Sequence, residues 1–417
     1  MTSTENGTVP NFSRAPQGPV RLFAAGADAE YAAHQATYGP LDIIKGDPGL
    51  RAELERSGLE GRGGAGFSTA RKVEAARLST TDRMFPASAV VIANGAEGEP
   101  RSIKDSTLLR HSPHLVIDGL LATAALVGAS RMYLHSSPES LDVLRSALAE
   151  RRDTRRIALV EAKETFISGE ASAVVNAIEN GIALPTDRTV RLTTSGLRGR
   201  PTLVHNVETL AHVALIARFG GDWFRSEGSG GDAGTRLVTV SGAGQRERVL
   251  EVPGNAGISD ILEAAGVSTS ILSAVLVGGY HGTWIPVEEL SVALSKSALA
   301  PFGGRPGAGV LFLLARDECG LQVTASITRY LAGESAGQCG PCLYGLDALA
   351  SLMERIASGS GERGLRKETE RLGFSLIGRG SCHHPDGTAG LVQSALTAFS
   401  SDVEAHLSGR CRRTARS

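Results

Sequence analysis

The feature that most constrains this chain is an alternation of apolar strand-like and helix-like segments between residues 88 and 163. The segment ASAVVIANG predicts a buried strand over residues 89–93, and an apolar helix pattern of small residues, LVIDGLLATAALVGA, follows it. A second strand is predicted from Met132, SPESLDVLRSALAERR predicts an amphipathic helix, and RRIALVEAK predicts a third strand. Strands joined by crossover helices form a parallel sheet, so we expect an α/β domain here.

A different pattern begins near Thr235. The segments RLVTVSG, RVLEVP, ISDILEAAG and SAVLVGG predict strand, strand, helix and strand within about fifty residues, and GVLFLLARD adds another strand. This spacing indicates a small α+β module. From Gln322 to His406 the chain is predicted to be helical, with breaks at ESAGQCGPC and GRGSCHHPDG.

Length and composition set the broad class of protein. A chain of 417 residues is too long for one hydrophobic core, which favours two to four domains. A hydrophobic content of 41% and a net charge of -1 are typical of a globular protein and give no reason to expect nucleic acid as a partner. The first twenty residues are polar and the longest apolar stretch is short, so we expect neither a secretory signal nor membrane insertion.

The segment GRGGAGFSTARK, residues 61–72, is the most specific motif. Four glycines in six positions let backbone N–H groups approach an anionic or planar ligand closely. Ser68, Thr69 and Lys72 add hydroxyl and ammonium donors. The segment is neither a Walker loop nor G-x-G-x-x-G, and by itself a structural turn explains it equally well.

A second polar segment, NGAEGEPRSIKD, follows the strand predicted over residues 89–93. Ligands of open α/β sheets bind at the carboxyl ends of the strands, so a ligand site is expected here as readily as an ordinary solvated loop. Its polar side chains are Asn94, Glu97, Glu99, Lys104 and Asp105.

Two further segments stand at predicted helix entries. Gly169 and Glu170 come directly before one helix pattern. His205, Asn206 and Thr209 open another, in the segment TLVHNVETL. Taken singly, each is better explained by helix capping than by ligand binding.

The cysteine pattern predicts a metal site. Cys339 and Cys342 form a C-x2-C pair and Cys382 follows at a distance, whereas the position three residues before Cys339 holds Ala336. Such a pair in a chain with few cysteines indicates metal or redox chemistry rather than a disulfide framework.

Two other cysteines carry less information. Cys319 follows a predicted strand, where a buried small apolar side chain is the simplest interpretation. Cys411 lies in the basic C-terminal segment RCRRTARS, which we expect to be a solvated tail.

Together, the segments SGLEGRGGAGFSTARK, NGAEGEPRSIKD, SGEASA, TSGLRGRPTLVHNVETL and ESAGQCGPC closely resemble the family of FMN- and NADH-binding subunits of respiratory complex I. The same subunit type occurs in NAD-dependent hydrogenases and formate dehydrogenases. The resemblance implies a Rossmann-like FMN domain, a β-grasp (ubiquitin-like) domain and a C-terminal helical bundle that holds a [4Fe–4S] cluster. The expected boundaries are a flexible tail over 1–34, the FMN domain over 35–234, the β-grasp domain over 235–320, the iron–sulfur domain over 321–408 and a tail over 409–417.

The resemblance also implies which residues contact FMN. Two positions depart from the family pattern: Ala96 stands in place of an Asp, and His205 replaces the first of two Asn. The loss at Ala96 removes an acceptor for the flavin ring, whereas an imidazole at position 205 still donates to a phosphate. The implied FMN contacts are Gly61, Arg62, Gly63, Gly64, Gly66, Lys72, Asn94, Glu97, Gly169, Glu170, His205, Asn206 and Thr209.

The implied nicotinamide dinucleotide pocket is less well kept. Phe67 and Glu99 match family contacts. An acidic residue that contacts the ribose repels a 2'-phosphate, whereas a neutral residue with arginine nearby tolerates it, so NADPH is admissible beside NADH. The same changes also fit a pocket that has lost dinucleotide binding. Four positions depart from the family: Ala75 and Arg191 replace aromatics, Ala171 replaces a Glu and Arg188 replaces a Lys.

The resemblance implies an iron–sulfur site in which Ala336 replaces one of four cysteines. Three thiolates fit a [3Fe–4S] cluster, or a [4Fe–4S] cluster in which one iron takes another ligand. A Cys3His zinc site with a neighbouring histidine and the absence of any metal are the alternatives. The residues concerned are Cys339, Cys342 and Cys382, followed by His383 and His384.

These inferences predict an FMN-dependent NAD(P)H dehydrogenase. FMN would take a hydride and the cluster would carry single electrons to an iron–sulfur or ferredoxin-like partner, so no side-chain acid, base or nucleophile is needed. We expect a divergent paralogue in the cytoplasm, with peripheral attachment to a membrane complex admissible. The rival interpretation is a flavin-binding scaffold or electron conduit without dinucleotide turnover.

Overall fold

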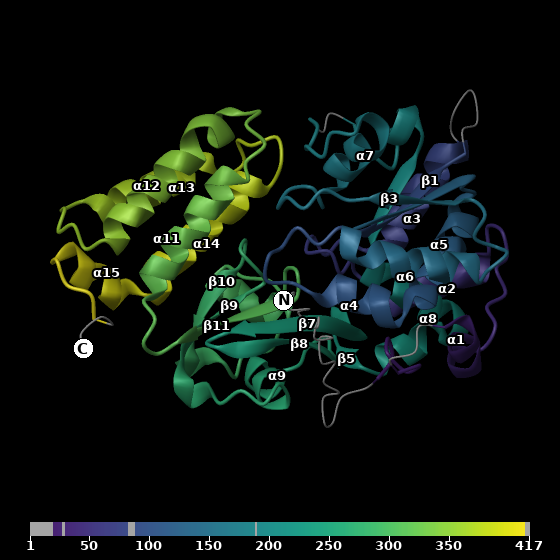
Figure 1. The fold of residues 1–417 in the computed structure, drawn as a ribbon, viewed down its shortest axis with the longest axis horizontal. Helices are drawn as coiled ribbons and strands as arrows, with labels where there is room; N and C mark the ends of the chain where they lie inside the picture. Colours follow the sequence, from purple (N-terminus) through teal and green to yellow (C-terminus); the bar gives the residue numbers. More distant parts are fainter. Residues whose placement is uncertain (1–19, 27–29, 82–87, 188–189, 413–417) are drawn as a thin grey trace, which may run out of the picture.

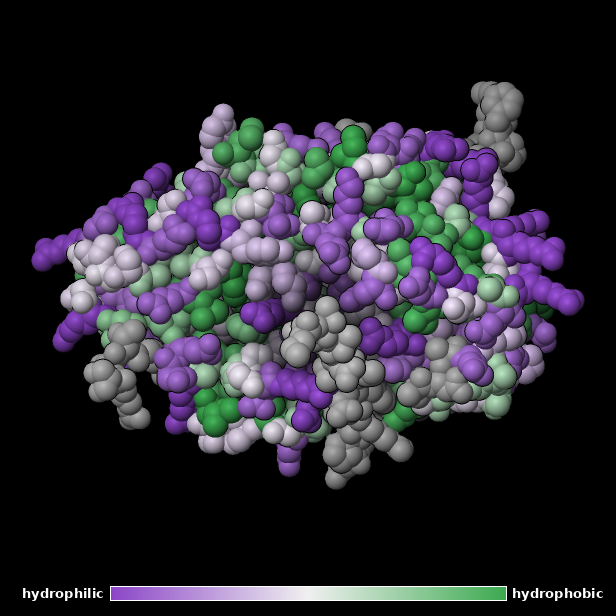
Figure 2. Space-filling view, viewed as in Figure 1, coloured by the Kyte–Doolittle hydropathy of each residue, from purple (hydrophilic) through white to green (hydrophobic). Residues whose placement is uncertain are grey.

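The computed structural model describes residues 20–26, 30–81, 88–187 and 190–412 of the chain. Figure 1 shows two sheet-containing parts and a group of C-terminal helices that lies beside them. No helix in these described ranges is both long and apolar enough to cross a membrane. Figure 2 shows a face that is mainly hydrophilic, with hydrophobic residues scattered between the polar ones.

The first part is built on a four-stranded sheet in the order β3-β2-β1-β4, with every pair parallel. This confirms the parallel sheet predicted from the alternation of segments. The strands are β1 (Val90–Gly95), β2 (Arg131–Ser136), β3 (Ile157–Glu161) and β4 (Thr202–Asn206). The accompanying helices are α1 (Tyr31–Tyr38), α2 (Pro48–Ser57), α3 (Thr69–Thr81), α4 (Lys104–His111), α5 (Pro113–Val127), α6 (Leu141–Ala149), α7 (Ala171–Asn180) and α8 (Val207–Arg225).

The continuous apolar run of β1 is explained by burial on both faces of the sheet. Val91 belongs to the large core cluster that includes α5 and α8, whereas Val90 and Ile92 pack with Val174 of α7 on the opposite face. Buried parallel strands characteristically lack an alternating polar face. The sheet is therefore of the Rossmann-like kind, with helices on both sides.

The second part is a five-stranded sheet in the order β10-β9-β11-β7-β8. Only the β11–β7 pair is parallel. The predicted succession of strand, strand, helix and strand after Thr235 is confirmed. Its elements are β7 (Thr235–Gly242), β8 (Gln245–Pro253), α9 (Ile258–Ala264), β9 (Leu272–Val277), β10 (Thr283–Pro286), α10 (Lys296–Leu299) and β11 (Val310–Ala315), and the short pair β5 (Gly228–Ser229) and β6 (Asp232–Ala233) precedes them.

The C-terminal helices pack against one face of this second sheet. Trp284 of β10 is fully buried there, and its indole N–H donates to the hydroxyl of Thr324 at 2.9 Å. The opposite face of the sheet packs on α9 in a separate core cluster. The helices are α11 (Gly320–Gly333), α12 (Leu346–Ala357), α13 (Leu365–Leu376), α14 (His384–Ala398) and α15 (Ser400–Leu407).

The predicted flexible tail over residues 1–34 is wrong for its described part. Leu22 and Phe23 are buried in the core of the first part. The backbone N–H groups of Arg21 and Leu22 both donate to the carboxylate of Glu251 at 2.9 Å, which ties this segment to β8. A two-residue apolar pair is too short to give a periodic signal, so the sequence pattern could not reveal this anchor.

The predicted C-terminal tail over 409–417 is also ordered in its described residues. The N–H groups of Gly409 and Arg410 bond back to the carbonyls of His406 and Ala405, which reverses the chain after α15. Residues 413–417 lie outside the described part of the chain.

Candidate functional site

The carboxyl edge of the parallel sheet brings together three of the polar segments singled out in the sequence. Asn94 near the end of β1 is the register partner of Asn206 at the end of β4. The amide of Asn94 donates to the carbonyl of Gly169 at 2.9 Å. The amide of Asn206 contacts the carbonyl of Asn94 at 3.4 Å, so segments more than one hundred residues apart meet at one edge.

The glycine loop closes over the same edge. The Gly61 N–H donates to the carbonyl of Phe67 at 2.8 Å, so the loop returns on itself before α3 begins. Its backbone then rests on the first turn of α8, where the Arg62 N–H donates to the Thr209 hydroxyl at 2.9 Å. A Cβ at Gly63 would lie 3.1 Å from the Cβ of Asn206, so this close approach favours glycine.

Two glycines of the loop also need unusual backbone angles. Gly64 has a φ of 97° and Gly66 a φ of 61°, in the region that side chains with a Cβ rarely adopt. The glycine cluster is therefore required by the conformation of the loop as well as by its contact with α8.

His205 is buried beside this loop at the end of β4. Burial, and secondarily the charge of Lys72, hold the pKa of His205 well below its usual value, so its imidazole is neutral at physiological pH. Its Nε2 atom has no hydrogen-bond partner among the described residues. Lys72 itself donates from Nζ to the carbonyl of Val204. An unpaired buried ring nitrogen beside a glycine loop suits a bound phosphate or flavin, so the residues present fit FMN.

Two predicted contact residues act as helix caps. Glu97 accepts from the N–H groups of Asp105 and Ser106 at 3.1 and 3.2 Å, at the start of α4. Glu170 accepts from the N–H groups of Ser172 and Ala173 at the start of α7. Their carboxylates therefore hold the two helices whose N-termini face the carboxyl edge of the sheet.

Glu99 lies apart from the other predicted contacts. Its carboxylate accepts the N–H of Tyr280 at 2.8 Å, from the loop between β9 and β10. Burial raises the pKa of Glu99 to about 7, against the opposing effect of the Tyr280 hydrogen bond. This residue therefore joins the first part of the molecule to the second sheet.

A buried ionic network supports the floor of the site. Lys104 contacts Asp105 at 2.6 Å and Glu208 at 2.8 Å, and all three side chains are buried. Asp105 in turn accepts from the amide of Asn206 at 2.6 Å. Glu208 also accepts the N–H of Leu237 at 2.8 Å, which connects α8 to β7.

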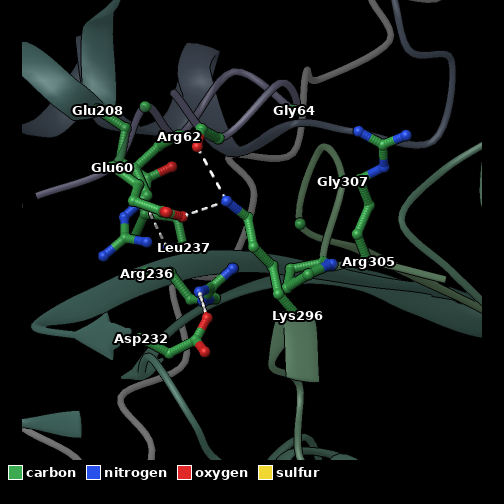
Figure 3. A pocket seen from close by; sticks show the side chains of 14 residues that line it. Glu60, Arg62, Gly64, Glu208, Asp232, Arg236, Leu237, Lys296, Arg305 and Gly307 are labelled. Carbon is green, nitrogen blue, oxygen red and sulfur yellow. Dashed lines mark hydrogen bonds and ion pairs between the residues drawn. The ribbon is translucent and has the colours of Figure 1, made fainter. Parts of the chain in front are cut away.

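A charged cavity lies between the glycine loop and the second sheet (Figure 3). Lys296 reaches from α10 to the carboxylate of Glu60 at 2.6 Å and to the carbonyl of Gly66 at 2.9 Å, so it braces the loop. Arg236 pairs with Asp232 at 3.0 Å. The charged residues of the lining are Glu60, Arg62, Glu208, Asp232, Arg236, Lys296 and Arg305.

No sequence pattern pointed to Lys296, Arg236 or Arg305, because each stands alone in a segment without a motif. They reach the cavity beside the glycine loop only because the second sheet packs against that loop. Their contribution is therefore a tertiary one.

The positions predicted for the dinucleotide lie around the loop and α7. Phe67, at the end of the glycine loop, is 69% exposed. Ala75 is half-buried on α3, Ala171 is the first residue of α7, and Arg191 is exposed. Arg188 lies outside the described residues.

The three predicted metal-ligating cysteines come together at the N-terminal end of α12. The thiol of Cys342 interacts with that of Cys339 and lies near Cys382. Burial, with these neighbouring thiols, raises the pKa of Cys342 to about 11. A π-helical turn, Pro341–Gly345, leads from the C-x2-C pair into α12, a distortion that is frequent at functional sites.

The position of the missing fourth cysteine is close to the other three. The backbone N–H of Ala336 interacts with the thiol of Cys342, so residue 336 faces the site without supplying a sulfur. A cysteine at this position would therefore lie beside the existing thiols.

The histidines considered as the fourth zinc ligand are engaged elsewhere. His384 donates from Nε2 to the carbonyl of Leu331 at 2.7 Å, and its Nδ1 pairs with Nε2 of His281 at 3.2 Å. His383 is 81% exposed and contacts Asp386. Both ring nitrogens of His384 are therefore engaged, which leaves His383 as the neighbouring histidine for the Cys3His alternative.

The loop before α7 connects the two candidate sites. The Phe166 N–H donates to the carboxylate of Glu334 at 2.8 Å, just before the cysteine segment. Its ring lies 4.6 Å from that of His281 and 5.5 Å from that of His384. Three residues later, Gly169 contacts Asn94 at the sheet edge. One short segment therefore contacts both sites.

Comparison with known proteins identifies both regions. Residues 54–215 match the Nuo51 FMN-binding domain, and residues 322–406 match the NADH-ubiquinone oxidoreductase-F iron-sulfur binding region. An F subunit of NADH-quinone oxidoreductase from Rhizobium meliloti is 29% identical over 376 residues, which cover 86% of this chain and 88% of that protein. NADP-reducing hydrogenase subunit HndC of Solidesulfovibrio fructosivorans is 26% identical over 398 residues, covering 91% of this chain and 80% of that protein.

The fold leads to the same group of proteins. A crystal structure of an NAD+-reducing [NiFe]-hydrogenase in the air-oxidized state is similar with a TM-score of 0.82 at 28% sequence identity. The match covers 95% of this chain and 68% of the hydrogenase chain. The chain therefore carries matches to both the Nuo51 FMN-binding domain and the NADH-ubiquinone oxidoreductase-F iron-sulfur binding region, and it is similar over most of its length to F subunits of NADH-quinone oxidoreductase.

Proposed function

We propose that this chain is the electron-input subunit of an FMN-dependent NAD(P)H dehydrogenase, which takes a hydride from NADH or NADPH and passes single electrons through an iron–sulfur cluster to a redox partner. The observation that carries the proposal is the convergence of the glycine loop with three polar segments at the carboxyl edge of the sheet. The comparisons give no support to the rival interpretation as a non-catalytic flavin scaffold.

The residues proposed to hold FMN act through backbone approach and fixed dipoles. The loop at Gly63 and Gly64 packs closely on Asn206 and Gly307, and its bare backbone would approach FMN there. The N-terminus of α8, a helix of 19 residues, favours an anionic phosphate beside Asn206 and Thr209. His205 adds a neutral imidazole whose Nε2 is available. When bound, FMN supplies the exchange between two-electron and one-electron chemistry.

The proposed cluster ligands are the thiolates of Cys339, Cys342 and Cys382. Because Ala336 contributes no sulfur and His384 is held by Leu331 and His281, the remaining iron of a [4Fe–4S] cluster would take a solvent ligand or be lost. We therefore propose a labile four-iron cluster that converts to a three-iron form.

Three finer features complete the proposal. The second sheet with α9 corresponds to a β-grasp domain over residues 235–320, and the C-terminal helices to the iron–sulfur bundle over 321–408. The redox partner is an iron–sulfur or ferredoxin-like protein that docks near the cluster. Large apolar side chains stay exposed beside the cysteines there, namely Leu343, Tyr344, Phe374 and Ile377. The proposed location is the cytoplasm, with attachment to a larger complex through that partner.

Flavin binding gives the decisive test. Purified protein should take up FMN, and Gly64→Val should reduce that affinity at least tenfold, because the loop needs a φ of 97° at this position. Gly46→Val is the matched control. Gly46 also has a positive φ, 67°, but it lies outside the glycine loop and an added side chain would meet no neighbouring atom, so FMN affinity should stay unchanged. Flavin fluorescence titration measures both. Wild-type protein that takes up no FMN under reconstitution would refute the proposed function.

The cluster is tested by Ala336→Cys. The added thiolate should hold four irons firmly, whereas the unaltered protein should show a three-iron signal after aerobic isolation, because one iron lacks a cysteine. Iron and sulfide analysis measures the iron content of each protein, and electron paramagnetic resonance detects the three-iron signal. Identical iron content and signals in the two proteins would contradict the proposed ligand set.

A further inference from the structure

Outside the site described above, a second group of metal-ligating side chains meets at the far end of the C-terminal helices. The ligand atoms of Cys319, His406 and Cys411 all lie within 4.8 Å of one another. Cys319 and His406 are buried, and Cys411 is half-buried. The three residues come from the start of α11, the last turn of α15 and the segment after α15, so no local motif announces them.

The group is distinct from the predicted iron–sulfur ligands. Cys342 lies just before α12, whereas His406 contacts the carbonyl of Ile356, in the last turn of that helix. A helix of 12 residues is roughly 18 Å long. The two groups therefore stand at opposite ends of α12, and α15 lies near the C-terminal end of the chain in Figure 1.

The imidazole of His406 is oriented as metal-binding imidazoles are. Its Nδ1 donates to the carbonyl of Ile356 at 3.1 Å, which leaves the lone pair on Nε2. That Nε2 faces the Sγ of Cys319 at 3.6 Å. A hydrogen bond from one ring nitrogen to a backbone carbonyl fixes the tautomer in most metal-ligating histidines.

The two thiols are brought to the histidine by the backbone. Cys319 directly precedes α11, a helix of 14 residues, and the N–H groups of Leu321 and Gln322 in its first turn point toward the sulfur. Burial raises the pKa of the Cys319 thiol, and these N–H groups oppose that effect. Gly409 adopts a φ of 76° after α15, and this left-handed turn sends the chain back so that Cys411 meets Cys319. The start of α11 and the turn at Gly409 after α15 thus bring the two thiols together.

We propose that Cys319, His406 and Cys411 form a second metal site that binds one zinc ion, with solvent as the fourth ligand. Two thiolates and one imidazole are a ligand set that zinc prefers, and ligands bound to one zinc lie about 3 to 4 Å apart. The Cys319–His406 separation of 3.6 Å already meets this requirement. Closure of the site needs only a small movement of the segment that carries Cys411.

The proposed zinc would fasten the end of the chain to the junction between β11 and α11. It would link residues 319 and 411 across the whole helical part, so its binding free energy would add to the stability of that part. This role is independent of flavin and of the proposed activity.

The test measures zinc uptake by the reduced full-length protein. After chelator treatment, titration with ZnCl2 should show a site that Cys411→Ser weakens at least tenfold. This substitution is chosen because it lies in a half-exposed segment after the last helix and leaves the core intact. Cys382→Ser, at the other end of α12, is the matched control and should leave this site unchanged. Cobalt in place of zinc should give thiolate-to-metal absorption that depends on Cys319 and Cys411.

Three outcomes would overturn the proposal. One is a reduced protein that takes up no zinc, and another is zinc uptake that Cys411→Ser and Cys319→Ser leave unchanged. The third is a Cys319–Cys411 disulfide, seen as a loss of two mass units in mass spectrometry, in a protein that binds no zinc after reduction. That result would make the two cysteines a redox couple instead of zinc ligands. Loss of zinc in Cys411→Ser with retained helical content supports the site.

Discussion

At the level of single residues, Ala171 stands where the family resemblance implies an acidic ribose contact, so it bears directly on the choice of dinucleotide. It is the first residue of α7, directly after the helix cap at Glu170. A carboxylate at a ribose-binding position repels a 2'-phosphate, and alanine removes that repulsion.

We therefore expect the unaltered protein to discriminate only weakly against NADPH. Ala171→Glu should lower kcat/KM for NADPH relative to NADH about tenfold, which corresponds to on the order of 1 kcal/mol of charge repulsion. Asn180→Glu adds the same charge to the exposed last turn of α7 and should change the ratio little. Steady-state kinetics with both dinucleotides provide the measurement, and strict NADH preference in the unaltered protein would contradict the interpretation.

At the scale of elements, α4 and α8 are held to each other and to β7 by one buried cation. Lys104 forms ion pairs with both Asp105 and Glu208. Burial, the largest single effect, opposes the charge on Glu208, but Lys104, His212 and Arg62 together outweigh it and lower the pKa of Glu208 to about 2. Burial likewise opposes the charge on Lys104, yet its two carboxylate partners raise the pKa of this lysine above its usual value.

Lys104→Met should cost about 3 to 5 kcal/mol of the free energy of unfolding, because it leaves two buried carboxylates without their cation. It should also weaken FMN binding, since Asp105 orients the amide of Asn206. Arg145→Met is the comparison: it removes an ion pair with Asp142 in which both side chains are more than half exposed, and such pairs contribute about 0 to 1 kcal/mol. Urea unfolding measures both, and equal losses would show that the buried network contributes no special stability.

At the scale of the whole molecule, buried histidines make stability depend on pH. Burial lowers the pKa of each of them below the usual value of about 6.5. In the unfolded chain they would take up protons below that pH, whereas in the folded protein they stay neutral until lower pH. Their contribution to stability is therefore complete above about pH 6.5 and is lost as the pH falls toward about 4. The group includes His135, His205, His212 and His281.

His135 gives the clearest test, because burial alone lowers its pKa to about 4 and neither ring nitrogen has a partner among the described residues. His135→Leu should therefore be more stable than the unaltered protein at pH 5 by roughly 2 kcal/mol beyond any difference at pH 7.5. Urea unfolding at the two pH values measures this. An effect of His135→Leu that is the same at pH 5 and pH 7.5 would contradict the assignment.

Local patterns in the sequence predicted the parts of this protein that depend on neighbouring residues. The parallel sheet, the strand–strand–helix–strand module and the helical C-terminal part follow from periodicity over about ten residues. The glycine loop and the C-x2-C pair follow from spacing within a few residues. These features were visible because each element buries its own apolar face or turns at its own glycines.

Contacts between distant segments could not be predicted in this way. The anchor of Arg21 and Leu22 on Glu251 spans about 230 residues, and the cavity lining from Lys296 depends on how the second sheet meets the glycine loop. From the sequence, the histidines beside Cys382 were candidate metal ligands, but in the folded protein both ring nitrogens of His384 form hydrogen bonds, to the carbonyl of Leu331 and to the imidazole of His281.

The elements, their order, the glycine loop and the cysteine spacing are thus specified along the chain, because they depend on backbone preferences and short-range burial. Which side chains share a site follows only from how these elements pack. This packing brings Cys319, His406 and Cys411 together from both ends of the helical part, and it sets Arg62 on Thr209. The physical reason is that a side chain's neighbours depend on how whole elements pack to bury apolar surface, and no short segment carries that information.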